Sequence, residues 1–202
     1  MTTKKLKSTF SIFILLSLVG CAFTHEVSIN PVRELSRKEK IPLRITLQLS
    51  PELCAYTLTK NRMGDQHIFP LGGPLCKGSE IVARAACTEV FIISKDSVAS
   101  EQKIDARLIP EIITVDYHMP QWAWEEQEAV IIVKWTLFDN AGKVLWIDTI
   151  QSKGSNKLGS TFSGLKRNRE TMQMAVDDLF QKSLESILSS QEIRRFAVSV
   201  AK

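Results

Sequence analysis

The stretch Val130-Ile-Ile-Val-Lys-Trp-Thr-Leu-Phe-Asp-Asn-Ala-Gly-Lys-Val-Leu-Trp-Ile-Asp-Thr-Ile150 contains two apolar segments separated by a short polar one. The polar part, Asp139–Lys143, has the composition of a tight turn. Gly142 can adopt the positive φ that a three-residue hairpin loop with a bulge requires. We therefore predict a β-hairpin with strands over 130–138 and 144–150.

The turn also predicts the register of this hairpin. If Asp139 faces Lys143, alternation along the strands places one wholly apolar face toward the core, with Leu137 opposite Leu145 and Trp135 opposite Ile147. Ile131 and Val133 extend that face. The opposite face is mixed, and we expect it to be partly exposed; it carries Lys134, Thr136, Trp146 and Asp148.

An amphipathic helix is expected after the hairpin, over residues 169–189, with Asn168 as its N-terminal cap. Apolar residues recur three and four positions apart, which gives one apolar stripe. This stripe most simply covers the apolar face of the sheet. Its members are Met172, Ala175, Val176, Leu179, Phe180, Leu184, Ile187 and Leu188.

The N-terminal half contributes further elements. Residues 42–49 alternate between apolar and polar side chains, which predicts a half-buried strand. Residues 55–60 favour a short second strand, and apolar residues three and four apart predict a helix over 75–91. Residues 104–117 are extended in character, and Pro110 should bend this strand or place it at a sheet edge.

The order of these elements predicts an α+β fold. We expect a two-layer domain over residues 41–190, in which helices pack on one face of a mostly antiparallel sheet. Residues 191–202 are expected to form a C-terminal tail. A length of 202 residues with 44% hydrophobic content suits one domain with a sizeable core.

The first 20 residues have the parts of a secretory signal. Lysines at positions 4, 5 and 7 precede an apolar run over 10–19. That run is about ten residues long, whereas a membrane-spanning helix needs roughly 20. An uncleaved amphiphilic anchor is the alternative interpretation, and ordinary cleavage beside a free cysteine is another.

The end of this segment, Leu18-Val19-Gly20-Cys21, resembles the lipobox of bacterial membrane lipoproteins. The resemblance implies cleavage between Gly20 and Cys21, and acyl chains such as palmitate on Cys21. Two or three chains would anchor the protein stably, where one would be marginal. An Asp after the cysteine often retains such proteins at the inner membrane, so Ala22 favours the outer membrane, facing the periplasm. Residues 21–40 would then be a lipidated N-terminus and a tether.

The charge balance excludes an electrostatic case for nucleic acid. Removing the leader and its three lysines leaves 23 basic and 22 acidic residues. Binding to nucleic acid would need a basic patch or stripe. The sequence also contains no recognisable cofactor or metal motif, so we expect no cofactor and no metal site.

Three cysteines remain beyond Cys21. Cys76 and Cys87 would share a helix and lie about 16 Å apart, which is beyond disulfide reach. Cys54 could pair with either of them, or all three could remain small buried thiols.

No known catalytic spacing occurs, and we predict that the protein is not an enzyme. The alternative is a periplasmic hydrolase with a Cys54–His67 or Cys87–His118 pair, because such pairs meet in space rather than in sequence. A lipid- or small-ligand-binding module is a further alternative, and it would need a sizeable apolar cavity between the helices and the sheet.

Trp122 and Trp124 form the most distinctive surface signal. Two tryptophans separated by one residue can project together and pack on a partner or a lipid, or they can close the end of the core. With Trp146 they make up the candidate interaction surface.

The segment from Ala129 to Leu188 is similar to auxiliary lipoproteins of ABC-type envelope transport systems. The resemblance lies in Leu137, Asp139, Gly142, Val144 and Leu145 of the hairpin and in the helix that follows. It implies a fold and a compartment more than a defined transporter. The expected function is therefore that of an accessory or scaffold in envelope assembly or transport, with a membrane anchor and an envelope protein partner.

Overall fold

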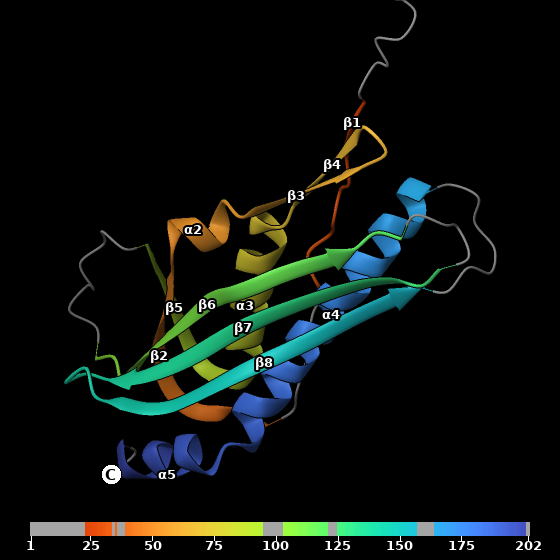
Figure 1. Ribbon diagram of the computed structural model, residues 1–202. Coiled ribbons are helices and arrows are strands. Elements are labelled where there is room, and N and C mark those ends of the chain that lie inside the picture. Colours follow the sequence, from red (N-terminus) through yellow and green to blue (C-terminus); the bar gives the residue numbers. More distant parts are fainter. Residues whose placement is uncertain are drawn as a thin grey trace, which may run out of the picture.

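The computed structural model describes residues 23–33, 35, 39–94, 103–120, 125–156 and 164–200. Within this part of the chain, two sheets and four helices form the α+β arrangement that the sequence predicts (Figure 1). None of these helices is both long and apolar enough to cross a membrane.

The larger sheet has five strands in the order β5-β2-β6-β7-β8. Its last three strands form the antiparallel meander expected from the hairpin, whereas β2 pairs parallel with both β5 and β6. The predicted strands β2, β6, β7 and β8 are confirmed, and β7 and β8 are longer than expected, whereas β5 begins within the predicted 75–91 helix. Their bounds are β2 Ile41–Leu49, β5 Cys87–Ser94, β6 Ala106–His118, β7 Gln127–Asp139 and β8 Val144–Asn156.

Pro110 lies where β6 becomes an edge strand. β6 pairs with β2 only over Ala106–Leu108 and continues beyond that point with β7 alone. The missing amide hydrogen of proline therefore removes no bond to β2.

Two helices cover one face of this sheet, α3 (Gly72–Ala86) and α4 (Gly164–Ser189). The apolar stripe of α4 is buried as predicted, from Met172 to Ile187. Asn168 lies inside α4 rather than at its cap. The predicted 75–91 helix ends at Ala86, because Cys87 already pairs with Ile41 in the sheet. A short α2 (Pro51–Cys54) precedes α3, and the expected C-terminal tail contains α5 (Gln191–Val200).

The smaller sheet has the order β1-β4-β3. β3 (Thr57–Arg62) and β4 (Asp65–Pro70) form a hairpin joined by Met63 and Gly64, which both have positive φ, 49° and 90°. Such a pair is typical of a type I′ turn. β1 (Thr24–Glu26) adds to β4 in parallel.

The expectation of a free tether over residues 21–40 is wrong for the part that the structure describes. Residues 24–26 form β1, and Val27, Ile29 and Val32 are buried in the core. The amide of Val27 also donates to the carbonyl of Ile68 over 2.8 Å. The apolar side chains of this segment pack against the domain because burial removes their apolar surface from water.

The hairpin register differs from the prediction by one residue. Asp139 does face Lys143, but Leu145 is an extra residue, so Leu137 lies opposite Trp146 and not opposite Leu145. Trp135 consequently faces Asp148 rather than Ile147. A bulge of one residue exchanges the two faces of a strand.

This exchange reverses the exposure expected along β8. Trp146 is buried, whereas Ile147 is 55% exposed. Asp148 turns toward α4 and accepts a hydrogen bond from the hydroxyl of Ser186.

α4 approaches its neighbours so closely that two glycines are required. A Cβ at Gly154 of β8 would overlap the carbonyl oxygen of Thr171, and a Cβ at Gly78 of α3 would overlap the ring of Phe180. At these two points α4 is therefore packed directly against β8 and α3.

We predict that Gly154→Ala lowers the free energy of unfolding by about 1–3 kcal/mol, because helix and strand must separate to admit the methyl group. Chemical denaturation would measure this change. Gly73→Ala is the control, since Gly73 is exposed near the start of α3 and a Cβ there meets nothing within 4 Å. Equal stability of the two variants would show that the close approach does not constrain the fold.

Candidate functional site

A buried polar cluster lies where β4, the end of β6, the start of β7 and the start of α4 meet. It consists of His67, Tyr117, Gln127, Asn168 and Thr171, and each is less than 9% exposed. The hydroxyl of Tyr117 lies 3.0 Å from Oδ1 of Asn168 and 3.2 Å from Oε1 of Gln127. Gln127 donates from Nε2 to the same Asn168 oxygen over 3.0 Å. Each side chain has polar partners, as buried polar groups require.

His67 joins this cluster to the N-terminal segment. Its Nδ1 lies 3.3 Å from Nδ2 of Asn168, so the neutral ring can accept a hydrogen bond from the amide. On its other side the ring of His25 lies 5.3 Å away, centroid to centroid. Burial lowers the pKa of His67, and the charges of His25 and Arg62 lower it further against the opposing effect of Asp65. His67 is therefore neutral at pH 7.

The sequence analysis assigned Asn168 to a helix cap and did not identify Thr171, although a signal for the burial of both was present. Asn168 lies three positions before Thr171, and Thr171 lies four positions before Ala175. Both residues therefore continue the buried stripe of α4 with polar groups. Extending the apolar stripe by one turn toward the N-terminus would have predicted their burial.

The structure decides which of the cysteine pairings that the sequence left open is formed. Cys54 and Cys76 form a disulfide that joins α2 to α3, with a Cα–Cα distance of 5.3 Å. Cys87 is a free thiol, and burial raises its pKa to about 12.

These states remove the nucleophiles of the hydrolase alternative. Cys54 has no thiol to ionise, and Cys87 remains protonated at neutral pH. Cys87 and His118 also lie toward opposite ends of the sheet, because Cys87 pairs with the start of β2 and His118 ends β6. Within the described ranges, no group of three or more His, Cys, Asp or Glu residues is placed to hold a metal ion.

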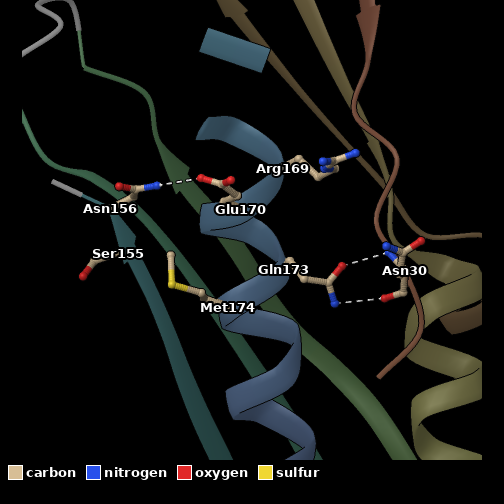
Figure 2. Close-up of a pocket in the computed structure, with 7 residues that line it drawn as sticks. All are labelled: Asn30, Ser155, Asn156, Arg169, Glu170, Gln173 and Met174. Carbon is tan, nitrogen blue, oxygen red and sulfur yellow. Dashed lines mark hydrogen bonds between the residues drawn. The ribbon is translucent and has the colours of Figure 1, made fainter. Parts of the chain in front are cut away.

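A groove of about 620 Å³ runs beside the first turns of α4 (Figure 2). Gln173 holds the main chain of Asn30 in this groove: it accepts from the amide over 2.9 Å and donates to the carbonyl over 3.1 Å. On the other side of α4, Asn156 donates to Glu170 over 3.3 Å. The walls are mostly amide and charged groups, so this is not the apolar cavity that a lipid-binding module would need. The lining residues are Asn30, Ser155, Asn156, Arg169, Glu170, Gln173 and Met174.

The predicted interaction residues have different outcomes. Trp146 is 8% exposed and packs in the core, so its assignment to a surface is wrong; the bulge in the hairpin is the reason. Trp122 and Trp124 lie outside the described residues, as do Gly20 and Cys21, and their roles stay predictions.

The face of β6, β7 and β8 turned away from α3 and α4 carries a different set of side chains, which we call the open sheet face. No helix covers it in Figure 1. Isoleucines alternate there with two ion pairs, Lys134–Glu111 and Lys153–Glu128, both at 2.5 Å. We define this face by Glu111, Glu128, Ile132, Lys134, Ile147 and Lys153.

Comparisons with known proteins identify a similar fold but no family. No family model matches the sequence, and no curated protein is similar to it. A protein of Xanthomonas campestris, described under the family model DUF330, has a similar structure. Its TM-score is 0.52 at 10% identity, covering 88% of this chain and 99% of the other. The domain thus shares the α+β fold of that protein.

Two further solved structures resemble the chain more loosely. One is a minor lipoprotein from Acinetobacter baumannii, with a TM-score of 0.43 at 12% identity, covering 75% of this chain and 94% of the other. The other is PelC from Paraburkholderia phytofirmans, described as a dodecamer, with a TM-score of 0.40 at 16% identity and coverage of 80% and 96%. At this level of similarity neither supports an argument about this chain.

We predict that the protein loses stability as the pH falls below about 6.5, because the unfolded chain then binds a proton that folded His67, with its lowered pKa, does not. Above that pH this contribution is fully present. In His67→Asn the free energy of unfolding should depend less on pH, since the amide oxygen can accept from Asn168 without titrating. Denaturation between about pH 7.5 and pH 5 measures this, with His118→Asn as a control outside the cluster. Parallel curves for wild type and His67→Asn would contradict the prediction.

Proposed function

We propose that this chain is a bacterial membrane lipoprotein whose domain acts as a non-enzymatic accessory or scaffold in envelope assembly or ABC-type transport. The observation that carries the proposal is the leader followed by Leu18-Val19-Gly20-Cys21. Acylation of Cys21 would attach the domain to a membrane, and Ala22 favours the outer membrane with the domain facing the periplasm.

The cysteine chemistry supports an envelope location. Disulfides persist in oxidising compartments, including the bacterial periplasm, and are rare in the cytosol. Cys54 of α2 and Cys76 of α3 form such a bond.

Two surfaces are proposed for the envelope protein partner: the segment with Trp122 and Trp124, and the open sheet face. The open sheet face presents Ile147, which is 55% exposed, between polar and charged neighbours. A mixed surface of this kind is typical of a non-obligate interface. Such a surface, combined with a membrane anchor, supports the proposed scaffold role.

We predict that Cys21→Ala abolishes acylation and moves the protein from the membrane to the soluble fraction, because the variant lacks the acyl chains that the proposed anchor buries in the bilayer. Mass spectrometry of the N-terminal peptide and membrane fractionation check both effects. Ala22→Asp is the matched variant: it should stay acylated and shift from the outer to the inner membrane. An unmodified Cys21 in the wild type would refute the lipoprotein proposal.

We further predict that the Trp122→Ala, Trp124→Ala double variant loses partner capture while keeping its thermal unfolding temperature. Crosslinking in intact membranes followed by purification measures capture, with wild type and Cys21→Ala compared in parallel. Ile147→Asp tests the open sheet face in the same way. Capture unchanged in both surface variants would remove the interaction claim.

A further inference from the structure

The folded domain begins almost at the cysteine that the proposed function acylates. Phe23 is already tied to the small sheet: its amide donates to Oδ1 of Asp65 over 3.3 Å, and its carbonyl accepts from the amide of Gln66 over 2.8 Å. Only Ala22 separates Phe23 from Cys21. Two residues of extended chain reach about 7 Å, so the anchor lies close to this end of the domain.

The same end carries two large apolar side chains in solvent. Phe23 is 61% exposed and Met63 is 77% exposed. Met63 sits in the turn between β3 and β4, two residues before the aspartate that holds Phe23. Figure 1 shows β1 and this turn projecting from one end of the molecule.

Met63 is an unfavourable choice for its position in two independent ways. It adopts a φ of 49°, a conformation that Asn and Gly adopt much more readily. It also places a flexible apolar side chain in water at the tip of a hairpin, where polar residues are usual. A residue that costs stability on both counts indicates a requirement other than folding.

Two of the charged groups near these side chains have polar partners within the domain. Asp65 accepts the hydrogen bond from Phe23 and lies 3.7 Å from Nε2 of His25. Lys60 of β3 pairs with Asp116 of β6 over 2.7 Å. Phe23 and Met63 therefore lie near Asp65 and Lys60, each of which already has a polar partner within the domain.

We propose that this end of the domain is a membrane-contact surface, in which Phe23 and Met63 insert into the boundary between lipid headgroups and acyl chains. The inference rests on the proposed acylation of Cys21, which brings this end to the bilayer. Apolar and aromatic side chains that enter this boundary add to the affinity supplied by acyl chains. The domain then sits on the membrane in a defined orientation, instead of hanging clear of the headgroups on a tether.

The test uses the full acylated protein in vesicles of phosphatidylethanolamine and phosphatidylglycerol. Met63→Cys carries an environment-sensitive dye, and Ala141→Cys, in the turn between β7 and β8, carries the same dye as the matched control. The native thiol Cys87 is buried and does not compete for the label. Quenching by lipids that carry nitroxide groups on the acyl chains reports which tip meets the bilayer.

If this end of the domain contacts the membrane, quenching at position 63 should be at least about threefold stronger than at position 141, and the emission of the dye at position 63 should be blue-shifted. Adding Phe23→Ser to the labelled Met63→Cys protein should reduce that quenching, because one of the two insertions is lost. Mass spectrometry and vesicle flotation are run on the same samples. Acylated, floating protein with equal quenching at both positions overturns this inference alone. Protein without an acyl chain overturns the proposed function and this inference with it.

Discussion

The close packing of α4 on its neighbours is the constraint on which the rest of the structure depends. Gly154 lets the backbone of α4 approach β8 directly, Gly78 lets the ring of Phe180 lie against α3, and the apolar stripe from Met172 to Ile187 fills the contact. At that distance the first turns of α4 bring polar side chains among the strand ends, where Asn168 completes the buried polar cluster. The same placement leaves little room for an apolar ligand between helix and sheet.

The N-terminal segment is held by this arrangement at several points. Gln173 of α4 binds the main chain of Asn30, β1 pairs with β4, and His67 of β4 contacts Asn168. The position of the chain just after the proposed anchor is thus coupled to the core. If Cys21 is acylated as we propose, this coupling would present the domain to the membrane in one orientation.

Local pattern identified most elements, and it failed where contacts were non-local. Strict alternation predicted β2, and three-four spacing predicted the buried face of α4. The turn at Asp139 was also correct, but a single extra residue, Leu145, moved Trp146 from the expected surface into the core. For the candidate site, the anchor motif could be proposed from sequence, whereas the buried polar cluster depends on residues from four elements far apart in the chain.

The sequence by itself determined the α+β class, the turn at Asp139 and the apolar stripe of α4, because each of these depends on residues within a few positions of one another. The leader and its lipobox-like end rest on the same kind of local signal and stay predictions. The tertiary structure alone decided that β2 pairs parallel with β5 and β6, and that Cys54 joins Cys76 rather than Cys87. It also decided that residues 23–33 belong to the domain instead of a tether. Each of these outcomes depends on which distant surfaces are buried together, and the free energy of that burial cannot be assigned to any one segment of the chain.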